Sequence, residues 1–284
     1  MKQSDSLIFK IFMYILLTLV AFLTLLPIVY AVLGSFKTSS ELFTIPEKLF
    51  PQAFTWDNYK EAFSSDVFNV GLMTKNSLIY TCCVVGASLI FSSMAGYAFA
   101  WGKFPLKNLI FVVFTGLMFI DMAGITVYPL FDVLNIINLN QSLWGLIVIK
   151  VFGVNVVQMH LFKSYIKTLP KELNEAARID GCNVLQTFWK IVAPLLLPVF
   201  ATCAILSFQS SWNEYLLPQI FTSARPDQRT LTVGIVALKN SGESAASPSL
   251  MLAGTTISLL PVIVVYIICN RYFVSGLAAG AVKG

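Results

Sequence analysis

The stretch L-P-K-E-L-N-E-A-A-R-I-D-G-C-N-V-L-Q-T-F-W-K-I-V-A-P, from Leu169 to Pro194, decides how this chain is interpreted. Pro170 suits the first turn of a helix, where a missing N–H costs nothing, and Glu172 follows where the helix dipole favours an acid. Apolar residues then recur at helical spacing, and Gly181 stands where a left-handed cap ends a helix. The stretch predicts a short amphipathic helix, a glycine turn and a second helix that leads into an apolar run.

The short helix has two interpretations on its pattern alone. It is either a helix that lies on the membrane surface or a helix that docks in the groove of another protein. In the second case, small Ala176 and Ala177 allow a close approach, and Glu175 supplies a directed charge.

The composition around this stretch is that of a membrane protein. Of 284 residues, 57% are hydrophobic and 12% are charged, whereas a typical soluble domain has about 25% charged residues. Lipid accepts apolar side chains on the outside of a fold, and water does not. The chain therefore predicts an all-α, polytopic bundle of membrane-spanning helices in a single domain, residues 1–284.

Apolar runs long enough to cross a bilayer occur six times. The first run is too long for a signal peptide, so we expect it to be retained. The six predicted spans are Ile11–Leu33, Leu72–Ala100, Leu109–Phe131, Leu143–Leu161, Ile191–Ser211 and Met251–Cys269.

Lysine and arginine in the connections set the expected orientation. With the N-terminus inside, eleven of these residues lie inside and seven lie in the longer outside connections. Both termini are therefore expected inside. Residues 34–71 and 212–250 form long outside segments, and residues 162–190 form the long inside segment.

Two ionisable side chains lie inside predicted spans, Asp121 and Lys150, and such groups are expensive in a membrane. A rise of 1.5 Å per residue places them at depths about 5 Å apart, within reach of each other. One interpretation is an internal ion pair or a lysine that extends outward. The alternative is a role in substrate passage or gating.

The polar group Trp212, Asn213, Glu214 and Tyr215 closes the fifth predicted span. Aromatic faces stack on sugar rings, and amide and carboxylate groups bond hydroxyls. The same residues also suit an aromatic anchor at the membrane interface, with polar groups that cap the helix. Both interpretations remain open.

The sequence lacks the residue patterns that are typical of metal sites and of nucleotide-binding sites. Five cysteines and one histidine show no metal-ligand spacing, so no metal site is expected. No G-x-x-x-x-G-K-[ST] phosphate loop occurs, so no bound nucleotide is expected on this chain. The net charge of +5 is explained by membrane orientation, and no nucleic-acid partner is expected.

The stretch that begins at Glu175 resembles the E-A-A loop of ABC importer permeases. The family pattern is E-A-A, three residues, G, nine residues and I-x-L-P. This chain has Glu175-Ala176-Ala177, then Gly181, then Ile191 and Ala193-Pro194 at those spacings, with alanine where the family prefers leucine. Cys182 stands where many relatives have alanine.

The resemblance extends over nearly the whole chain. The segments A-G-Y-A-F-A-W-G-K-F (95–104), W-N-E-Y-L-L-P (212–218) and the C-terminal run from Arg271 are similar to those of carbohydrate-importer permeases. The most similar group is the smaller, six-span permease of maltose-type and other oligosaccharide importers. The resemblance therefore implies a carbohydrate, without naming one.

This family resemblance implies a non-enzymatic subunit of an importer in a prokaryotic cytoplasmic membrane. Glu175, Ala176, Ala177, Asp180 and Gly181 are then residues that couple the chain to a cytoplasmic ATPase, which binds ATP and Mg²⁺. The implied partners are a second permease in a heterodimer, two ATPase copies and an extracellular or periplasmic binding protein.

Two other function classes, secondary transporters or channels and membrane-embedded enzymes, predict different sequence features. A secondary transporter or channel predicts ionisable relays in several spans and inverted repeats, and the sequence shows one pair and no evident repeat. A membrane-embedded enzyme predicts carboxylates, a His or Cys dyad or metal ligands at one depth. No such set is evident.

Overall fold

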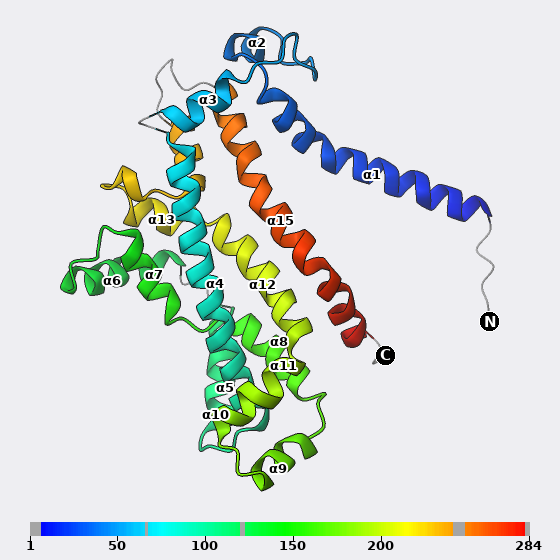
Figure 1. The fold of residues 1–284 in the computed structure, drawn as a ribbon, viewed down its shortest axis with the longest axis vertical. Helices are drawn as coiled ribbons and strands as arrows, with labels where there is room; N and C mark the ends of the chain where they lie inside the picture. The colour runs from blue at the N-terminus through cyan, green and yellow to red at the C-terminus, as the bar shows by residue number, and fades with distance from the viewer. Residues whose placement is uncertain (1–6, 66–67, 120–122, 241–247, 282–284) are drawn as a thin grey trace. The chain divides into compact units, whose positions relative to one another are not determined.

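The computed structural model describes residues 7–65, 68–119, 123–240 and 248–281, and the regular structure in these ranges is helical (Figure 1). This confirms the all-α prediction. Contacts divide the chain into two units. One holds residues 1–71 and 234–259, and the other holds residues 72–233 and 260–284. The prediction of a single permease domain stays a prediction, and each unit is described by itself.

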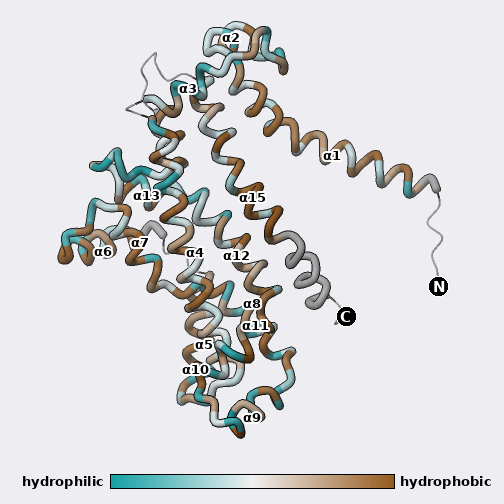
Figure 2. Tube along the Cα trace, in the orientation of Figure 1, coloured by the Kyte–Doolittle hydropathy of each residue, from teal (hydrophilic) through white to brown (hydrophobic). Residues whose placement is uncertain are grey.

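The first unit contains the apolar helix α1 (Leu7–Gly34) and the first part of α15 (Pro248–Ala281). The end of α1 packs closely on α15, because a Cβ added at Gly34 would lie 2.6 Å from Leu252 Cδ1. Nearby, Thr256 Oγ1 donates to the Ala31 carbonyl at 3.4 Å. Figure 2 shows that apolar residues predominate along α1 and along the coloured part of α15.

The predicted outside segment after α1 is folded rather than extended. It contains α2 (Ser39–Thr44) and α3 (Asp57–Ser64). The buried Asn58 amide donates to the carbonyls of Ser35 at 2.7 Å and Lys37 at 2.8 Å, which ties α3 to the end of α1. Since buried backbone carbonyls need partners, one side chain satisfies two of them here.

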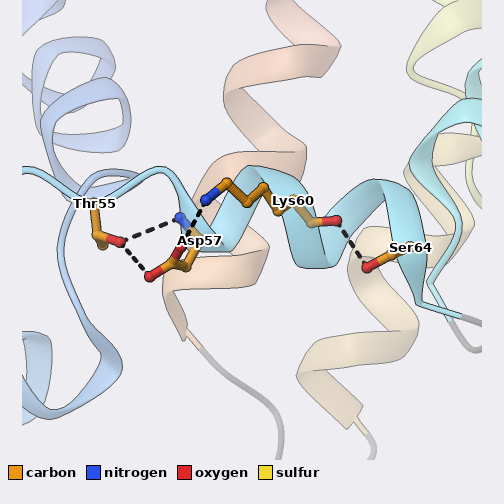
Figure 3. Close-up of polar contacts among 4 residues, drawn as sticks. All are labelled: Thr55, Asp57, Lys60 and Ser64. Carbon is orange, nitrogen blue, oxygen red and sulfur yellow. Dashed lines mark hydrogen bonds and ion pairs between the residues drawn. The ribbon is translucent and has the colours of Figure 1, made fainter.

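Helix α3 begins with a local polar cluster (Figure 3). The Thr55 hydroxyl donates to Asp57 Oδ2 at 2.9 Å, and Lys60 Nζ lies 3.3 Å from Asp57 Oδ1. The Thr55 hydroxyl and the Lys60 ammonium hold the pKa of the Asp57 carboxyl below its usual value. One turn further, the Ser64 hydroxyl donates to the Lys60 carbonyl at 2.9 Å.

The second unit is built around α4 (Val70–Trp101), of which residues 72–101 belong to it. The small residues Ser88, Ser92, Gly96 and Ala100 recur every fourth position on this helix. A Cβ at Gly96 would lie 2.7 Å from Phe162 Cβ and 3.0 Å from the Lys163 nitrogen. The stripe therefore brings α4 against another helix of the same chain, α8 (Val156–Ile166).

The helices of the second unit surround two apolar cores. One core joins α4 and α8 to the π-helical turn Phe188–Val192 and to α12 (Leu197–Trp212). The other joins α4 to α6 (Ala123–Ile136), α7 (Leu143–Val151) and α13 (Leu216–Phe221). The other described elements of this unit are α5 (Lys107–Leu117), α9 (Glu172–Ile179), α10 (Val184–Thr187), α11 (Ala193–Leu195) and a 3-10 turn at Pro226–Gln228. Helix α14 (Leu231–Asn240) begins in the second unit, and its residues from 234 onward belong to the first.

Four described helices are long and apolar enough to cross a membrane: Phe9–Gly34, Val70–Trp101, Leu143–Ile166 and Pro248–Cys269. They coincide with the first, second, fourth and sixth predicted spans. The fifth corresponds to a pair of helices, Val184–Leu195 and Leu197–Trp212, bent by 82°. Pro198 in the first turn of α12 lacks the N–H that would continue the helix, which explains the break there.

The third predicted span, Leu109–Phe131, is not one continuous helix in the described residues. Helix α5 ends at Leu117, Met118 and Phe119 form a turn, and α6 begins at Ala123. The six-span count and the orientation therefore stay predictions. Asp121, one of the predicted site residues, lies outside the described residues.

Candidate functional site

The predicted inner helix forms as α9, and its end follows the Schellman pattern. The N–H of Cys182 donates to the Ala177 carbonyl at 2.9 Å, and the N–H of Gly181 donates to the Arg178 carbonyl at 3.1 Å. Gly181 has φ +77°, the left-handed conformation that its position predicts. The chain then turns into α10, where Asn183 and Gln186 form a capping box.

Four of the five predicted coupling residues are exposed: Glu175, Ala176, Asp180 and Gly181. Ala177 differs, because it is only 1% exposed and faces the interior of its own chain. Of the two alanines, Ala176 therefore remains available for close approach by a partner. Apolar side chains are also exposed beside this helix, with Ile179 at 87% and Val184 at 66%.

Helix α9 is attached to α4 as well as to α10. The Tyr97 hydroxyl of α4 donates to Asn174 Oδ1 at 3.4 Å, and the Tyr97 ring packs on Phe188 with centroids 5.4 Å apart. A pocket of about 230 Å³ lies between these elements, with Trp101 and Arg178 in its wall. Helix α9 is thus in contact with α4, and the same tyrosine also contacts the π-helical turn that leads into α12.

A second, more polar pocket of about 400 Å³ lies between α4, α7, α8 and α12. Gly153, Val154 and Asn155 line it, and they form the non-helical break between α7 and α8. The break falls in the middle of the candidate span Leu143–Ile166. At membrane depth, non-helical backbone is tolerated only inside protein or beside a water-filled cavity. We call this cavity the mid-span pocket.

The break is stabilised by polar groups of α4 and of its own segment. Ser92 Oγ accepts from the Asn155 N–H at 3.1 Å and donates to the Asn155 carbonyl at 3.2 Å. The Asn155 side chain caps α8 by accepting from the Gln158 N–H at 3.1 Å. Both backbone polar groups of Asn155 therefore have hydrogen-bond partners, although no helix continues through this residue.

An ion pair borders the mid-span pocket. Lys150 Nζ lies 2.8 Å from Glu214 Oε1, and the two side chains are 31% and 21% exposed. The hydroxyl of Tyr80, itself buried, donates to the other carboxylate oxygen at 2.6 Å. Side chains of α4 and α7 thus converge on one carboxylate, which lies two residues after the end of α12.

Uncharged polar groups continue the lining. The Ser88 hydroxyl donates to Gln158 Oε1 at 2.9 Å, and the Gln158 amide donates to the Ser207 hydroxyl. Ser210 and Ser211 of α12 complete the polar wall. The pocket therefore presents hydroxyls, amides and one charge-balanced pair.

The structure separates the residues that sequence analysis grouped. Lys150 and Glu214 line the mid-span pocket, and they pair with each other. Trp212 is 3% exposed and stacks on Phe208, with centroids 5.6 Å apart. Neither Asn213 nor Tyr215 is in the described lining, and the Asn213 amide donates to the Gln209 carbonyl at 2.9 Å. Of the four residues from Trp212 to Tyr215, Glu214 is the one in the described lining of the pocket.

Sequence analysis missed Tyr80, Asn155, Gln158 and Ser207. They are uncharged, so a search for ionisable residues in spans passes over them. The available signal was an amide pair, Asn155 and Gln158, two and five residues after Gly153 in the middle of an apolar run. Ser88 belongs to the row of small residues on α4, and it also lines the pocket.

Comparison with known proteins matches residues 6–278 to the model of the family described as "Binding-protein-dependent transport system inner membrane component". The arabinooligosaccharides transport system permease protein AraQ of Bacillus subtilis is 32% identical, over 98% of this chain and 97% of the relative. The sn-glycerol-3-phosphate transport system permease protein UgpE of Yersinia pestis bv. Antiqua is 30% identical, over 94% of this chain and 95% of the relative.

A solved structure supports the same fold. It is a chain of a bacterial ABC transporter involved in the import of the acidic polysaccharide alginate. The two chains superpose with a TM-score of 0.80 at 24% identity, over 96% of this chain and 99% of that one. The fold is therefore that of an ABC importer permease.

Proposed function

The chain belongs to the family of binding-protein-dependent transport system inner membrane components, and on this premise we propose that it is the permease subunit that carries a carbohydrate, an oligosaccharide in particular, through the mid-span pocket. The substrate is delivered by an external binding protein. The energy comes from ATP and Mg²⁺ on a separate ATPase chain, and this chain is not an enzyme.

The observation that carries the path is the helix break in the middle of a candidate span. Gly153, Val154 and Asn155 line the mid-span pocket, and non-helical backbone at membrane depth is typical of a segment inside protein or beside a water-filled cavity. Interrupted helices near the bilayer midplane are also where other transporter folds bind substrate. Hydroxyl and amide groups in the wall match the donors and acceptors of a sugar.

The relatives support the substrate class. The names of AraQ and UgpE refer to arabinooligosaccharides and to glycerol phosphate, and both cargoes are rich in hydroxyl groups or built on a polyol. The solved neighbour belongs to an importer of a polysaccharide. A carbohydrate is the class that these names and the pocket wall have in common.

The coupling role falls on α9. Its exposed face presents Glu175 and Ala176, with Ile179 beside them, and its other side is attached to α4 through Tyr97 and Asn174. A helix of this kind, with an apolar and small-residue face, suits a groove on a partner. In this proposal, closure of two ATPase copies moves α9, and α4 and α12 transmit the movement to the pocket.

The complete importer contains a second permease, in a heterodimer with this chain, and lies in a prokaryotic cytoplasmic membrane. The test is gentle detergent extraction of the tagged chain from its native cell, followed by mass spectrometry. Recovery of a P-loop ATPase and a second multi-span permease supports the proposal. Recovery of the chain alone, under conditions that preserve a known ABC importer, contradicts it.

A further inference from the structure

The charge of the mid-span pocket is balanced within the chain. Among the described residues that line it, the charged ones are Lys150 and Glu214, and they form an ion pair at 2.8 Å. The other polar lining groups are hydroxyls, amides and backbone. The wall therefore has no net charge to offer to a substrate.

We propose that Glu214 is a specificity-determining residue, which neutralises Lys150 and so suits the pocket to uncharged, hydroxyl-rich substrates over anionic ones. This inference rests on the proposed function, because it assumes that substrate passes the mid-span pocket. It also addresses a point that the similar proteins leave open, since the cargoes in their names are the neutral arabinooligosaccharides in one case and the anionic glycerol phosphate and alginate in the others.

The geometry favours a permanent neutralisation over a substrate-dependent one. Glu214 Oε1 accepts from Lys150, and Oε2 accepts from the Tyr80 hydroxyl at 2.6 Å. Tyr80 is 1% exposed and belongs to the apolar core beside the pocket, so its hydroxyl is held in place. Both carboxylate oxygens are thus engaged before any substrate arrives, and Lys150 has its counter-ion.

The neutral part of the wall has the right chemistry for sugar hydroxyls. A hydroxyl both donates and accepts, as do the Ser88, Ser207 and Ser210 side chains and the Gln158 amide. An anion such as a phosphate or a uronate needs donors and positive charge, and it is repelled by a carboxylate. With Glu214 present, an anion gains little from Lys150.

The test measures the charge of the pocket directly with cysteine reagents. In the assembled importer, the five native cysteines are replaced and Ser210→Cys is introduced. Ser210 is exposed, lines the pocket and lies four residues before Glu214. Rates of modification are compared for a cationic trimethylammonium-ethyl, an anionic sulfonatoethyl and a neutral hydroxyethyl methanethiosulfonate, each normalised to its rate with a free small thiol.

With the native pair present, we expect similar normalised rates for the anionic and cationic reagents. Glu214→Gln should raise the anion-to-cation ratio about tenfold, because it leaves an uncompensated lysine in a medium of low dielectric constant. Lys150→Met should lower the ratio in the same way. The double variant Lys150→Met/Glu214→Gln is the matched control, and it should restore the ratio of the native pair.

The outcomes separate the two proposals. If none of the three reagents modifies the cysteine in any nucleotide state, the pocket is not a hydrated path and the proposed function fails. If all react, but the native pair strongly prefers one charge or the single variants leave the ratio unchanged, the path stands and the neutral-filter inference is overturned.

Discussion

Lys150 and Glu214, which are 64 residues apart in the sequence, are joined by an ion pair with an Nζ–Oε1 distance of 2.8 Å. The pair connects the last turn of α7 with the residue two positions after α12, so it fixes one side of the mid-span pocket. It also assigns a partner to a lysine that lies within a candidate span.

Removal of one partner should destabilise the chain more than removal of both. Lys150→Met or Glu214→Gln alone should each cost about 1–3 kcal/mol, because each leaves one charged group without its hydrogen-bond partner. The double variant should recover about 1 kcal/mol or more relative to the sum of the singles. Thermal unfolding of the assembled complex in detergent measures this cycle, and purely additive losses would contradict a direct interaction.

Close packing of α4 on α8 should make Gly96 intolerant of side chains. A Cβ there would lie 2.7 Å from Phe162 Cβ and within 3.1 Å of two α8 backbone atoms. Gly96→Val should therefore cost about 1–3 kcal/mol from overpacking. Gly86 lies on the same helix with nothing within 4 Å of its Cβ position.

Gly86→Ala is accordingly the matched control for Gly96→Val, and it should be neutral or stabilise by up to about 1 kcal/mol. Thermal stability of the detergent-solubilised complex, followed by size-exclusion chromatography after heating, compares the two. Equal losses at both positions would show that the contact between α4 and α8 is not close.

The coupling role of α9 predicts different effects from its two first-turn acids. Glu172 and Glu175 are both exposed on α9, but only Glu175 belongs to the E-A-A motif. Glu175→Ala should weaken retention of the ATPase about tenfold or more, as expected for a central contact of an interface. Glu172→Ala should leave retention near that of the native chain. Titration of the purified permease pair with the ATPase measures both, and equal effects would argue against a directed contact at Glu175.

The left-handed turn after α9 predicts a choice among substitutions. At Gly181, φ is +77° and no atom lies within 4 Å of an added Cβ, so only the backbone restricts the residue. Gly181→Val should cost about 1–2 kcal/mol and misdirect α9, whereas Gly181→Asn should be tolerated better, because asparagine visits this conformation. ATPase retention and thermal stability of both variants test this, and full tolerance of valine would show that the turn is not required.

Local sequence signals predicted the inner segment well. Proline at the start of the stretch, alanines at helical spacing and Gly181 as a cap each act within one or two turns, so they can be read without tertiary information. Prolines are local signals of the same kind, and the structure has an 82° bend where Pro194 and Pro198 stand. Small residues at every fourth position of α4 favour close helix packing, but this pattern does not say which helix is the partner, and in the structure it is α8.

The neighbour that each side of a helix faces could not be predicted from local signals. Depth estimates put Asp121 and Lys150 within reach, but depth does not say which side of a helix faces which neighbour, and the structure pairs Lys150 with Glu214. The break at Gly153–Asn155 was also not anticipated, because apolar residues on both sides make the run look continuous. The polar partner of its backbone, Ser92, comes from a helix more than fifty residues earlier in the sequence.

The central claim is that substrate crosses the membrane through the mid-span pocket. ATP-driven uptake of a labelled neutral oligosaccharide, one that the partner binding protein retains, is measured in proteoliposomes that contain the complete importer. Ser210→Trp fills the pocket, and Gln209→Trp places the same bulk on the neighbouring residue of α12, outside the pocket lining. The account predicts loss of uptake with Ser210→Trp, with the ATPase still bound, and uptake near the native rate with Gln209→Trp. Native uptake with Ser210→Trp would contradict it.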